Sequence, residues 1–321
     1  MPTKLLITGA SGFLGGALVN VLSQVASLDV VASSRSHSHL PDDVVFHSVS
    51  EINSHTDWSE ALNQIEVLVH TAARVHIMND TVEDPLALFR AVNTAGTLNL
   101  ARQAAAAGVK RFIFISSVKV NGESTSRDGC FSADDPPQPT DAYAVSKYEA
   151  EQGLLALSRE TSMEVVIIRP VLVYGPGVKA NFLQLMRLLH KGIPLPLGAI
   201  HNRRSFVGLE NLIDFIRLCI DHPAAANQIF LVSDGHDVSS SDLARAIVRL
   251  MGSKLWLPPI PGQVISLLAK LLGREAAASR LLGSLRVSIS KNRERLNWSP
   301  PVSLDDGLKR TVEQFLIMER K

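Results

Sequence analysis

One stretch constrains the fold of this chain more than any other: the glycine-rich run Thr8 to Gly16, TGASGFLGG. A short apolar run, residues 5–7, precedes it, and apolar residues at helical spacing follow it. This order predicts a strand, a glycine turn and a helix. Gly9 would make the tight turn, Gly12 would let the backbone approach a ligand, and Gly15 would let the helix pack closely on the strand. The unpaired N–H groups at the start of that helix suit a diphosphate.

The chain after this run alternates strands with helices. Near-continuous apolar segments predict strands at residues 29–33, 44–46, 66–70, 111–115, 164–169 and 228–232. Helices are expected at 57–62, 85–107 and 142–159. Buried strands separated by helices are typical of an α/β fold with a parallel, doubly wound sheet.

Beyond Arg169 the composition changes, because prolines and glycines interrupt a series of short helices. We predict a dinucleotide-binding domain of residues 1–172, to which residues 205–235 return. Residues 173–204 and 236–321 would form a smaller, mostly helical substrate-binding domain.

Charge and cysteine content exclude several classes of protein. The net charge of +1 gives no reason to expect nucleic acid as a partner. Cys130 and Cys219 lie far apart without metal-ligand spacing, which indicates neither a metal site nor a disulfide framework. No apolar run is long enough to span a bilayer, and a strand begins within four residues of Met1 in place of a signal peptide. We therefore expect a cytoplasmic protein.

The end of the second predicted strand bears on the choice of cofactor. In NAD sites an acidic side chain usually stands there and holds the ribose 2′-hydroxyl. Here Ser33, Ser34 and Arg35 occupy these positions. Arg35 could pair with a 2′-phosphate through charge-assisted hydrogen bonds, or it could be a solvated loop residue. We favour NADP(H), with NAD(H) possible.

Three residues indicate acid–base chemistry on a carbonyl group. Tyr143 and Lys147 are four apart on a predicted helix, so they share one face. A phenol has a pKa of about 10, too high for proton transfer at neutral pH, and a nearby ammonium favours the phenolate. Such pairs are also common on helix surfaces. Ser117, at the end of a central strand, could donate a second hydrogen bond to the oxygen that Tyr143 protonates.

Further candidates stand after other strands. Small residues at Thr71–Ala73 leave room for a ligand, and Arg74 and His76 follow in a loop. A lone histidine is more often structural than catalytic. Lys119 and Asn121 come shortly after Ser117. Arg204 could clamp a diphosphate, unless it belongs to a surface arginine pair.

Together these motifs resemble the extended short-chain dehydrogenase/reductase family. The resemblance rests on the glycine run, HTAA at 70–73, Asn93, Ser117, Tyr143-x-x-x-Lys147 and RPVLVYGP at 169–176. It covers essentially the whole chain and implies a Rossmann sheet. Within the family, the chain is most similar to the bacterial branch of nucleotide-sugar epimerases, dehydratases and 4-keto reductases. The run SVKVNGE at 117–123 is most similar to reductases of the UDP-N-acetylquinovosamine type.

The resemblance also implies a set of site residues. We expect the cofactor to contact Gly9, Ser11, Gly12, Phe13, Leu14, Gly15, Ser34, Arg35, Thr71, Ala72, Ala73, Asn93, Lys147 and Pro170. We expect the substrate to contact Arg74, His76, Lys119, Asn121, Asn181 and Arg204, with Asn181 and Arg204 on its diphosphate. A homodimer through the helices at 85–107 and 142–159 is a further implication.

The first hypothesis is NAD(P)H-dependent reduction of a 4-keto group on a nucleotide-linked hexose, with UDP expected, in surface polysaccharide synthesis. Tyr143 would donate the proton, Lys147 would lower its pKa and hold the nicotinamide ribose, and Ser117 would bind the carbonyl oxygen. Epimerases of this branch generally carry an acidic residue where Ser34 stands, and dehydratases an Asp-Glu pair where Val118-Lys119 stand. Two alternatives stay open: an NAD-dependent 4-epimerase of UDP-linked or lipid-diphosphate-linked glucose or N-acetylhexosamine, and a non-catalytic NAD(P)-binding scaffold.

Overall fold

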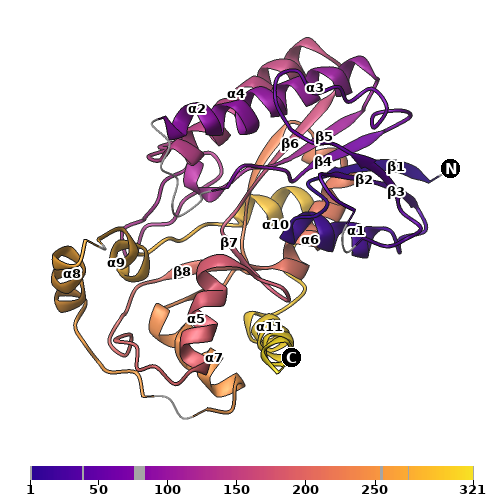
Figure 1. The fold of residues 1–321 in the computed structure, drawn as a ribbon. Helices are drawn as coiled ribbons and strands as arrows, with labels where there is room; N and C mark the ends of the chain where they lie inside the picture. The colour runs from indigo at the N-terminus through magenta and orange to yellow at the C-terminus, as the bar shows by residue number, and fades with distance from the viewer. Residues whose placement is uncertain (1, 38–39, 76–83, 254–255, 274, 321) are drawn as a thin grey trace.

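A seven-stranded parallel sheet forms the centre of the larger part of the molecule (Figure 1). The computed structural model describes residues 2–37, 40–75, 84–253, 256–273 and 275–320. The strand order is β3-β2-β1-β4-β5-β6-β9. The strands are β1 (Thr3–Thr8), β2 (Leu28–Ser34), β3 (Val45–Ser48), β4 (Val67–His70), β5 (Arg111–Ile115), β6 (Glu164–Pro170) and β9 (Gln228–Val232). The predicted doubly wound α/β fold is confirmed.

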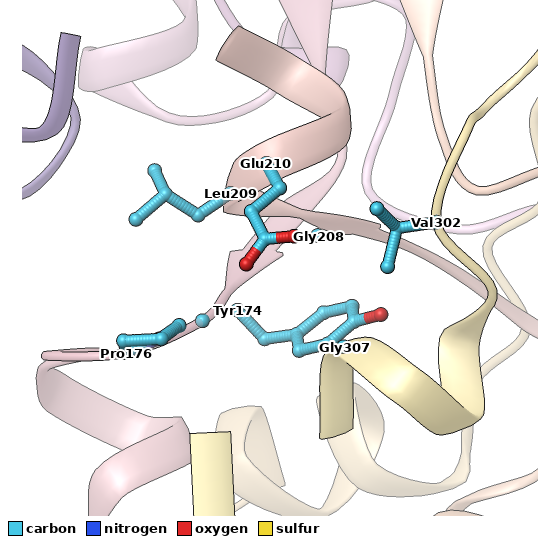
Figure 2. Close-up of a pocket in the computed structure, with 8 residues that line it drawn as sticks. Tyr174, Pro176, Gly208, Leu209, Glu210, Val302 and Gly307 are labelled. Carbon is cyan, nitrogen blue, oxygen red and sulfur yellow. The ribbon is translucent and has the colours of Figure 1, made fainter. Parts of the chain in front are cut away.

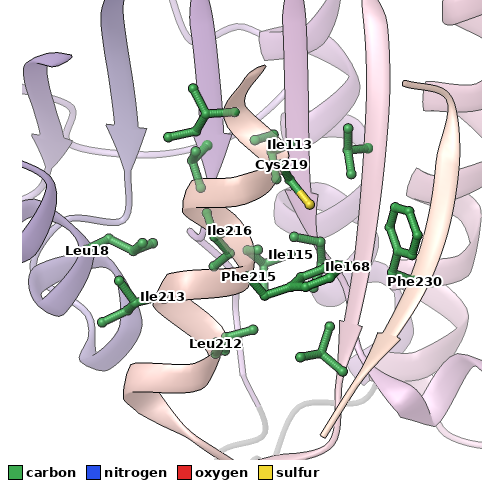
Figure 3. Close-up of a cluster of buried hydrophobic side chains, with 14 of the residues drawn as sticks. Leu18, Ile113, Ile115, Ile168, Leu212, Ile213, Phe215, Ile216, Cys219 and Phe230 are labelled. Atoms are coloured by element: carbon green, nitrogen blue, oxygen red, sulfur yellow. The ribbon is translucent and has the colours of Figure 1, made fainter. Parts of the chain in front are cut away.

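Helices cover both faces of this sheet (Figure 1). One face carries α1 (Phe13–Leu22), α6 (Leu209–Asp221) and α10 (Ser290–Leu296). The other carries α2 (Pro85–Phe89), η1 (Arg90–Gly96), α3 (Thr97–Ala106) and α4 (Ala142–Glu160). The two faces are visible within β5, where Ile113 packs into the core under α6 and Phe112 into the core on the opposite face. Figure 3 shows the first of these cores, with Phe215 and Ile216 of α6 turned toward the strands.

The helix predicted at 85–107 is three segments in the structure. Asp84 accepts a hydrogen bond from Ala87 N and Pro85 stands in the first turn, as expected of a helix start. Residues 90–96 then form a π-helical segment before α3 begins. The helix predicted at 57–62 is wrong: Asp57 accepts from Ser59 N at 2.9 Å, and a series of turns follows.

The smaller part of the molecule contains a three-stranded sheet in the order β10-β8-β7. Its strands are β7 (Leu172–Tyr174), β8 (Arg204–Gly208) and β10 (Asp237–Val238). The helices α5 (Ala180–His190), α7 (Ser240–Leu250) and α11 (Leu304–Glu319) share its apolar core, and α8 (Gly262–Leu271) and α9 (Glu275–Leu282) lie at its edge (Figure 1). The run Ser205–Val207 predicts β8 from the sequence, whereas β7 and β10 were not expected.

Residues 205–235 pass between the two parts. β8 is a strand of the small sheet. β9 is a strand of the large sheet, and α6 packs against that sheet. The division into the two predicted domains stays a prediction. Among the described residues, no helix has both the length and the apolar character needed to cross a membrane.

Candidate active site

The glycine turn after β1 is packed so closely that it excludes side chains. Gly9 has a φ of +76°, which favours glycine. A Cβ on Gly15 would lie 2.2 Å from the carbonyl oxygen of Gly9 and 2.7 Å from Thr71 Oγ1. A Cβ on Gly9 would lie 2.6 Å from the backbone nitrogen of Ala72. The turn, α1 and the segment after β4 are therefore in direct backbone contact, as expected of Gly9 and Gly15.

The start of α1 is open toward solvent. Gly12 is the N-cap residue, and no side chain caps the helix. Ser11 and Gly12 are exposed, and Phe13 and Leu14 are partly exposed. A helix start that lacks a capping side chain keeps backbone N–H groups and a positive dipole end for an anion. These residues fit the diphosphate of a dinucleotide.

The end of β2 has one charged side chain that reaches solvent. Ser34 is buried, and its Oγ donates to the carbonyl oxygen of Ser36 at 2.6 Å. Arg35 is exposed. The carboxylate expected of an NAD site is therefore absent from this turn, and Arg35 remains positioned for a phosphate.

The segment after β4 is held by buried polar contacts. Thr71 Oγ1 donates to the carbonyl oxygen of Thr8 at 2.7 Å. Thr8 Oγ1 and Thr97 Oγ1 lie 2.6 and 3.1 Å from the ring nitrogens of His70. Burial, together with the charge of Lys147, lowers the pKa of His70 to about 3, so its ring is neutral. Ala72 and Ala73 follow, partly exposed.

Asn93 connects this segment to α4. Its Oδ1 accepts from Arg74 N at 2.8 Å, and its Nδ2 donates to the carbonyl oxygen of Arg74 and to Ser146 Oγ, each at 3.1 Å. Asn93 is only 1% exposed. These contacts connect the loop to α4, and the expected cofactor contact of Asn93 stays a prediction. His76 lies outside the described residues.

Tyr143 lies in the first turn of α4. Asp141 caps the helix by accepting from Ala144 N at 2.7 Å. The Tyr143 ring meets Phe89 edge-on, with ring centres 6.0 Å apart. Desolvation, and to a smaller extent the charge of Asp141, raises the pKa of Tyr143 to about 12. The phenol therefore needs a nearby positive charge to transfer its proton near neutral pH.

Lys147 supplies a nitrogen in the right place, one helical turn further. It is 1% exposed, and its Nζ donates to the carbonyl oxygen of Ile115 at 2.8 Å and lies 4.4 Å from the Phe114 ring centre. Burial lowers the pKa of Lys147 to about 7, against the opposite effect of Glu151. Its charge is therefore sensitive to neighbouring charges in the physiological range.

Ser117 follows β5 and begins the short helix η2 (Val118–Val120), which contacts α4. It is partly exposed, and its Oγ accepts from Lys119 N at 3.2 Å. The side chain of Lys119 pairs with Asp141 and with Glu123. Asn121 is buried and donates to the carbonyl oxygen of Ser132 at 2.9 Å. Lys119 and Asn121 therefore both have protein partners, and their expected sugar contacts stay predictions.

Three more candidates lie toward the small sheet. Pro170 is buried at the end of β6. Asn181 is exposed in the first turn of α5. Arg204 begins β8, and its Nη1 donates to the carbonyl oxygen of Gly283 at 3.0 Å. Burial lowers the pKa of Arg204.

The carboxyl ends of the parallel strands bring the main candidates to one edge of the sheet. Gly9, Thr71 and Ser117 follow β1, β4 and β5, and Ser34 and Pro170 end β2 and β6. Ligands of open α/β sheets bind at this edge. It faces the smaller part of the molecule (Figure 1).

A small cavity elsewhere is not the substrate site. Figure 2 shows it between Tyr174, Pro176, Leu209 and Val302. Its volume of about 10 Å³ has room for about one water molecule. Tyr174 donates to Asp234 Oδ2 at 2.8 Å beside it, so this region is a structural joint between β7 and the end of β9.

A buried ion pair, not predicted from the sequence, lies one helical turn beyond Lys147. Glu151 of α4 is 0% exposed and pairs with Arg169 of β6, which is 1% exposed. Ser116 Oγ also donates to Glu151, at 2.5 Å. Two signals were present: Glu151 is four residues after Lys147, and Arg169 stands alone among apolar residues in β6.

Comparisons with known proteins agree with this geometry. A family model described as "NAD dependent epimerase/dehydratase family" matches residues 5–233. A UDP-glucose 4-epimerase of Vibrio cholerae is 50% identical to this chain, over 98% of the chain and 96% of its own length. A UDP-glucose 4-epimerase of Mycolicibacterium smegmatis is 30% identical over 97% of this chain and 98% of its own.

A solved structure shows the same fold. It is the UDP-glucuronic acid 4-epimerase from Bacillus cereus in complex with NAD, with a TM-score of 0.79. The match covers 98% of this chain and 99% of the other at 22% identity.

Proposed function

The chain belongs to the NAD dependent epimerase/dehydratase family, and from this membership we propose that it is a 4-epimerase of a UDP-linked hexose. The observation that carries the proposal is the 50% identity with the Vibrio cholerae UDP-glucose 4-epimerase over nearly the full length of both chains. The family predicted from the sequence is confirmed. The relatives support the epimerase that was the alternative hypothesis more than the 4-keto reductase that was the first.

Epimerisation at carbon 4 is a reversible oxidation. The 4-hydroxyl loses a proton and carbon 4 loses a hydride, which gives a 4-keto sugar. The hydride then returns to the opposite face of carbon 4, and the proton returns to the oxygen. A bound nicotinamide dinucleotide supplies the hydride acceptor. The chain itself must bind the sugar, move the hydroxyl proton and exclude water.

The proton transfer is assigned to Tyr143. Its phenolate would take the proton from the 4-hydroxyl and return it to the 4-keto oxygen. Ser117 would hold the same oxygen through a hydrogen bond. The ammonium of Lys147 would favour the phenolate, since both side chains lie on α4 one turn apart.

The substrate diphosphate is assigned to Arg204 and Asn181, and Arg74 is placed beside the sugar. Support comes from Arg204 at the start of β8 and from Asn181 at the start of α5. A guanidinium matches the paired oxygens of a phosphate. Uridine as the base follows the names of the relatives.

One observation favours a second function. The turn after β2 has the exposed Arg35 and lacks the carboxylate expected of an NAD site. This supports NADP(H) as the cofactor and, with it, reduction of a UDP-linked 4-keto hexose, for which NADPH would be consumed. The dinucleotide that the protein carries therefore distinguishes the two functions.

The experiment begins with the nucleotide released from the purified protein, followed by incubation with UDP-glucose without added reductant. We expect bound NAD(H) and conversion to UDP-galactose. The Tyr143→Phe variant is the control: it should keep the nucleotide and lose the conversion. Absence of conversion, together with NADPH consumption on a UDP-4-keto sugar, would replace the epimerase with the reductase. The proposed homodimer and cytoplasmic location need separate measurements, by sedimentation and by fractionation.

A further inference from the structure

A buried set of polar side chains lies on or next to the elements that carry the residues assigned to proton transfer. Arg169 Nε donates to Glu151 Oε1 at 2.9 Å, and Arg169 Nη2 donates to Glu151 Oε2 at 2.5 Å. The remaining terminal nitrogen of Arg169, Nη1, donates to Asn121 Oδ1 at 2.9 Å. Ser116 Oγ donates to Glu151 Oε1. Both carboxylate oxygens and all three guanidinium nitrogens therefore have partners.

These contacts join every element that carries a proton-transfer residue. Glu151 is on α4 with Tyr143 and Lys147, Ser116 precedes Ser117, and Asn121 ends the turn that Ser117 begins. These elements are joined by an ion pair, although apolar side chains could also have packed them together. A buried ion pair is weak evidence for stability, so its presence calls for another role.

The geometry leaves Lys147 outside the ion pair. Glu151 is one helical turn from Lys147, at the spacing where Lys and Glu ordinarily pair. Arg169 occupies both oxygens of Glu151, and Lys147 Nζ instead donates to the carbonyl oxygen of Ile115 at 2.8 Å. The ammonium is therefore held at the end of β5, close to Ser117.

We propose that Arg169 is a positioning residue that keeps Glu151 from pairing with Lys147, so that the Lys147 ammonium stays available to Tyr143. The inference rests on the proposed use of Tyr143 and Lys147 in proton transfer. The charges of Arg169 and Glu151 also cancel each other. The net charge of the pair therefore sets the electrostatic potential at the Lys147 side chain.

Other charged groups face this region from each neighbouring element. His70 on β4 is neutral because its pKa is about 3. Asp141, before α4, faces Tyr143 and is paired with Lys119 of η2. These groups stay the same in all variants below, so changes can be assigned to the Arg169–Glu151 pair.

The test uses two single variants with opposite charge effects. Glu151→Gln leaves the positive charge of Arg169 uncompensated, which lowers the pKa of both Lys147 and Tyr143. Arg169→Gln leaves Glu151 free to pair with Lys147, which raises both pKa values. The pH profile of turnover should therefore move toward acid in the first variant and toward alkali in the second, each by about one pH unit. The double variant Glu151→Gln/Arg169→Gln should return close to the native profile.

A control ion pair exists at the opposite end of β6, where β6 pairs with β5. Arg111 begins β5 and pairs with Glu164, which begins β6, at 2.6 Å. Arg111→Gln removes a buried guanidinium from a similar pair far from Lys147. It should leave the pH profile unchanged. Shifts of both single variants in the same direction, or a shift in the control, would overturn the inference.

A second readout separates this inference from the proposed function. NMR of lysine-labelled protein follows the titration of Lys147 directly, with its signal identified by loss in Lys147→Met. Opposite shifts in the two single variants support the inference even where UDP-glucose is not converted, which would refute only the epimerase. Conversion of UDP-glucose without these shifts would refute only the inference. If Arg169→Gln does not fold, the other two variants test the inference. It requires an acid shift of the pH profile in Glu151→Gln and a return to the native profile in the double variant.

Discussion

The glycine turn and the α4 site lie at the same edge of the sheet, yet they are built in opposite ways. The turn depends on side chains that are missing, since a Cβ on Gly15 would lie 2.2 Å from a backbone oxygen. The α4 site depends on charged side chains that are buried, with Lys147, Glu151 and Arg169 each no more than 1% exposed. Substitutions should therefore act through shape in the first region and through charge in the second.

The largest expected effect is in the charged region. Tyr143→Phe removes the hydroxyl to which we assign proton transfer and little else, so we expect turnover to fall by about 10²–10⁴-fold. Turnover should be measured together with the melting temperature and the bound nucleotide, both of which should stay close to native. Near-native turnover would remove Tyr143 from the chemistry.

The corresponding change in the shape-dependent region is Gly15→Ala. The added methyl group would overlap the carbonyl oxygen of Gly9 and Thr71 Oγ1, so α1 must move. Overpacking of this kind destabilises by about 1–3 kcal/mol. We expect a lower free energy of unfolding and a smaller amount of bound nucleotide. Gly16→Ala is the control, because its nearest contact would be 3.1 Å. Equal effects of the two substitutions would contradict the packing argument.

The dependence of stability on pH provides a test of the buried charge. The pKa of Lys147 is lowered to about 7 in the folded protein and is about 10.4 in an unfolded chain. Between these values the unfolded chain binds the extra proton, so this group makes the protein more stable as pH rises from about 7 to about 10. The slope has an upper limit of about 1.4 kcal/mol per pH unit. Chemical denaturation across this range should show a smaller slope for Lys147→Met. Equal slopes would mean that Lys147 has an ordinary pKa.

The smallest expected effect is at the exposed end of β2. If Arg35 contacts a 2′-phosphate, Arg35→Ala should weaken NADP(H) binding by about tenfold and leave NAD(H) binding unchanged. The difference should diminish at high salt, because the contact is exposed. Equal weakening of both nucleotides would contradict the expected role of Arg35.

The same contrast explains what the sequence could predict. The glycine turn is local: Gly9, Gly12 and Gly15 stand within seven residues, next to a strand and a helix. The Arg169–Glu151 pair joins two elements and becomes visible only when β6 and α4 are packed together. The contacts of Asn93 with Arg74 and Ser146 likewise join separate elements and could not be predicted from the sequence.

Secondary structure could also be predicted where it depends on local sequence and not where it depends on contacts with distant residues. The long buried strands could be predicted because apolar runs need no partner to be recognised. β10 has two residues and β7 has three, too few to show the alternation of apolar and polar side chains typical of a strand. Both are strands because they pair with β8. Asp57 looked like a helix cap because capping is local, but the chain after it continues in turns.

The long stretch between β6 and β9, residues 171–227, has a consequence for how the protein is made. β9 pairs with β6, but it is synthesised only after this whole stretch has been translated. Until then β6 is an open edge of apolar strand, which is prone to pair with other chains. The nascent protein is therefore most vulnerable to aggregation during this interval. Slower translation between the codons for Pro170 and Gln228 would lengthen that exposure.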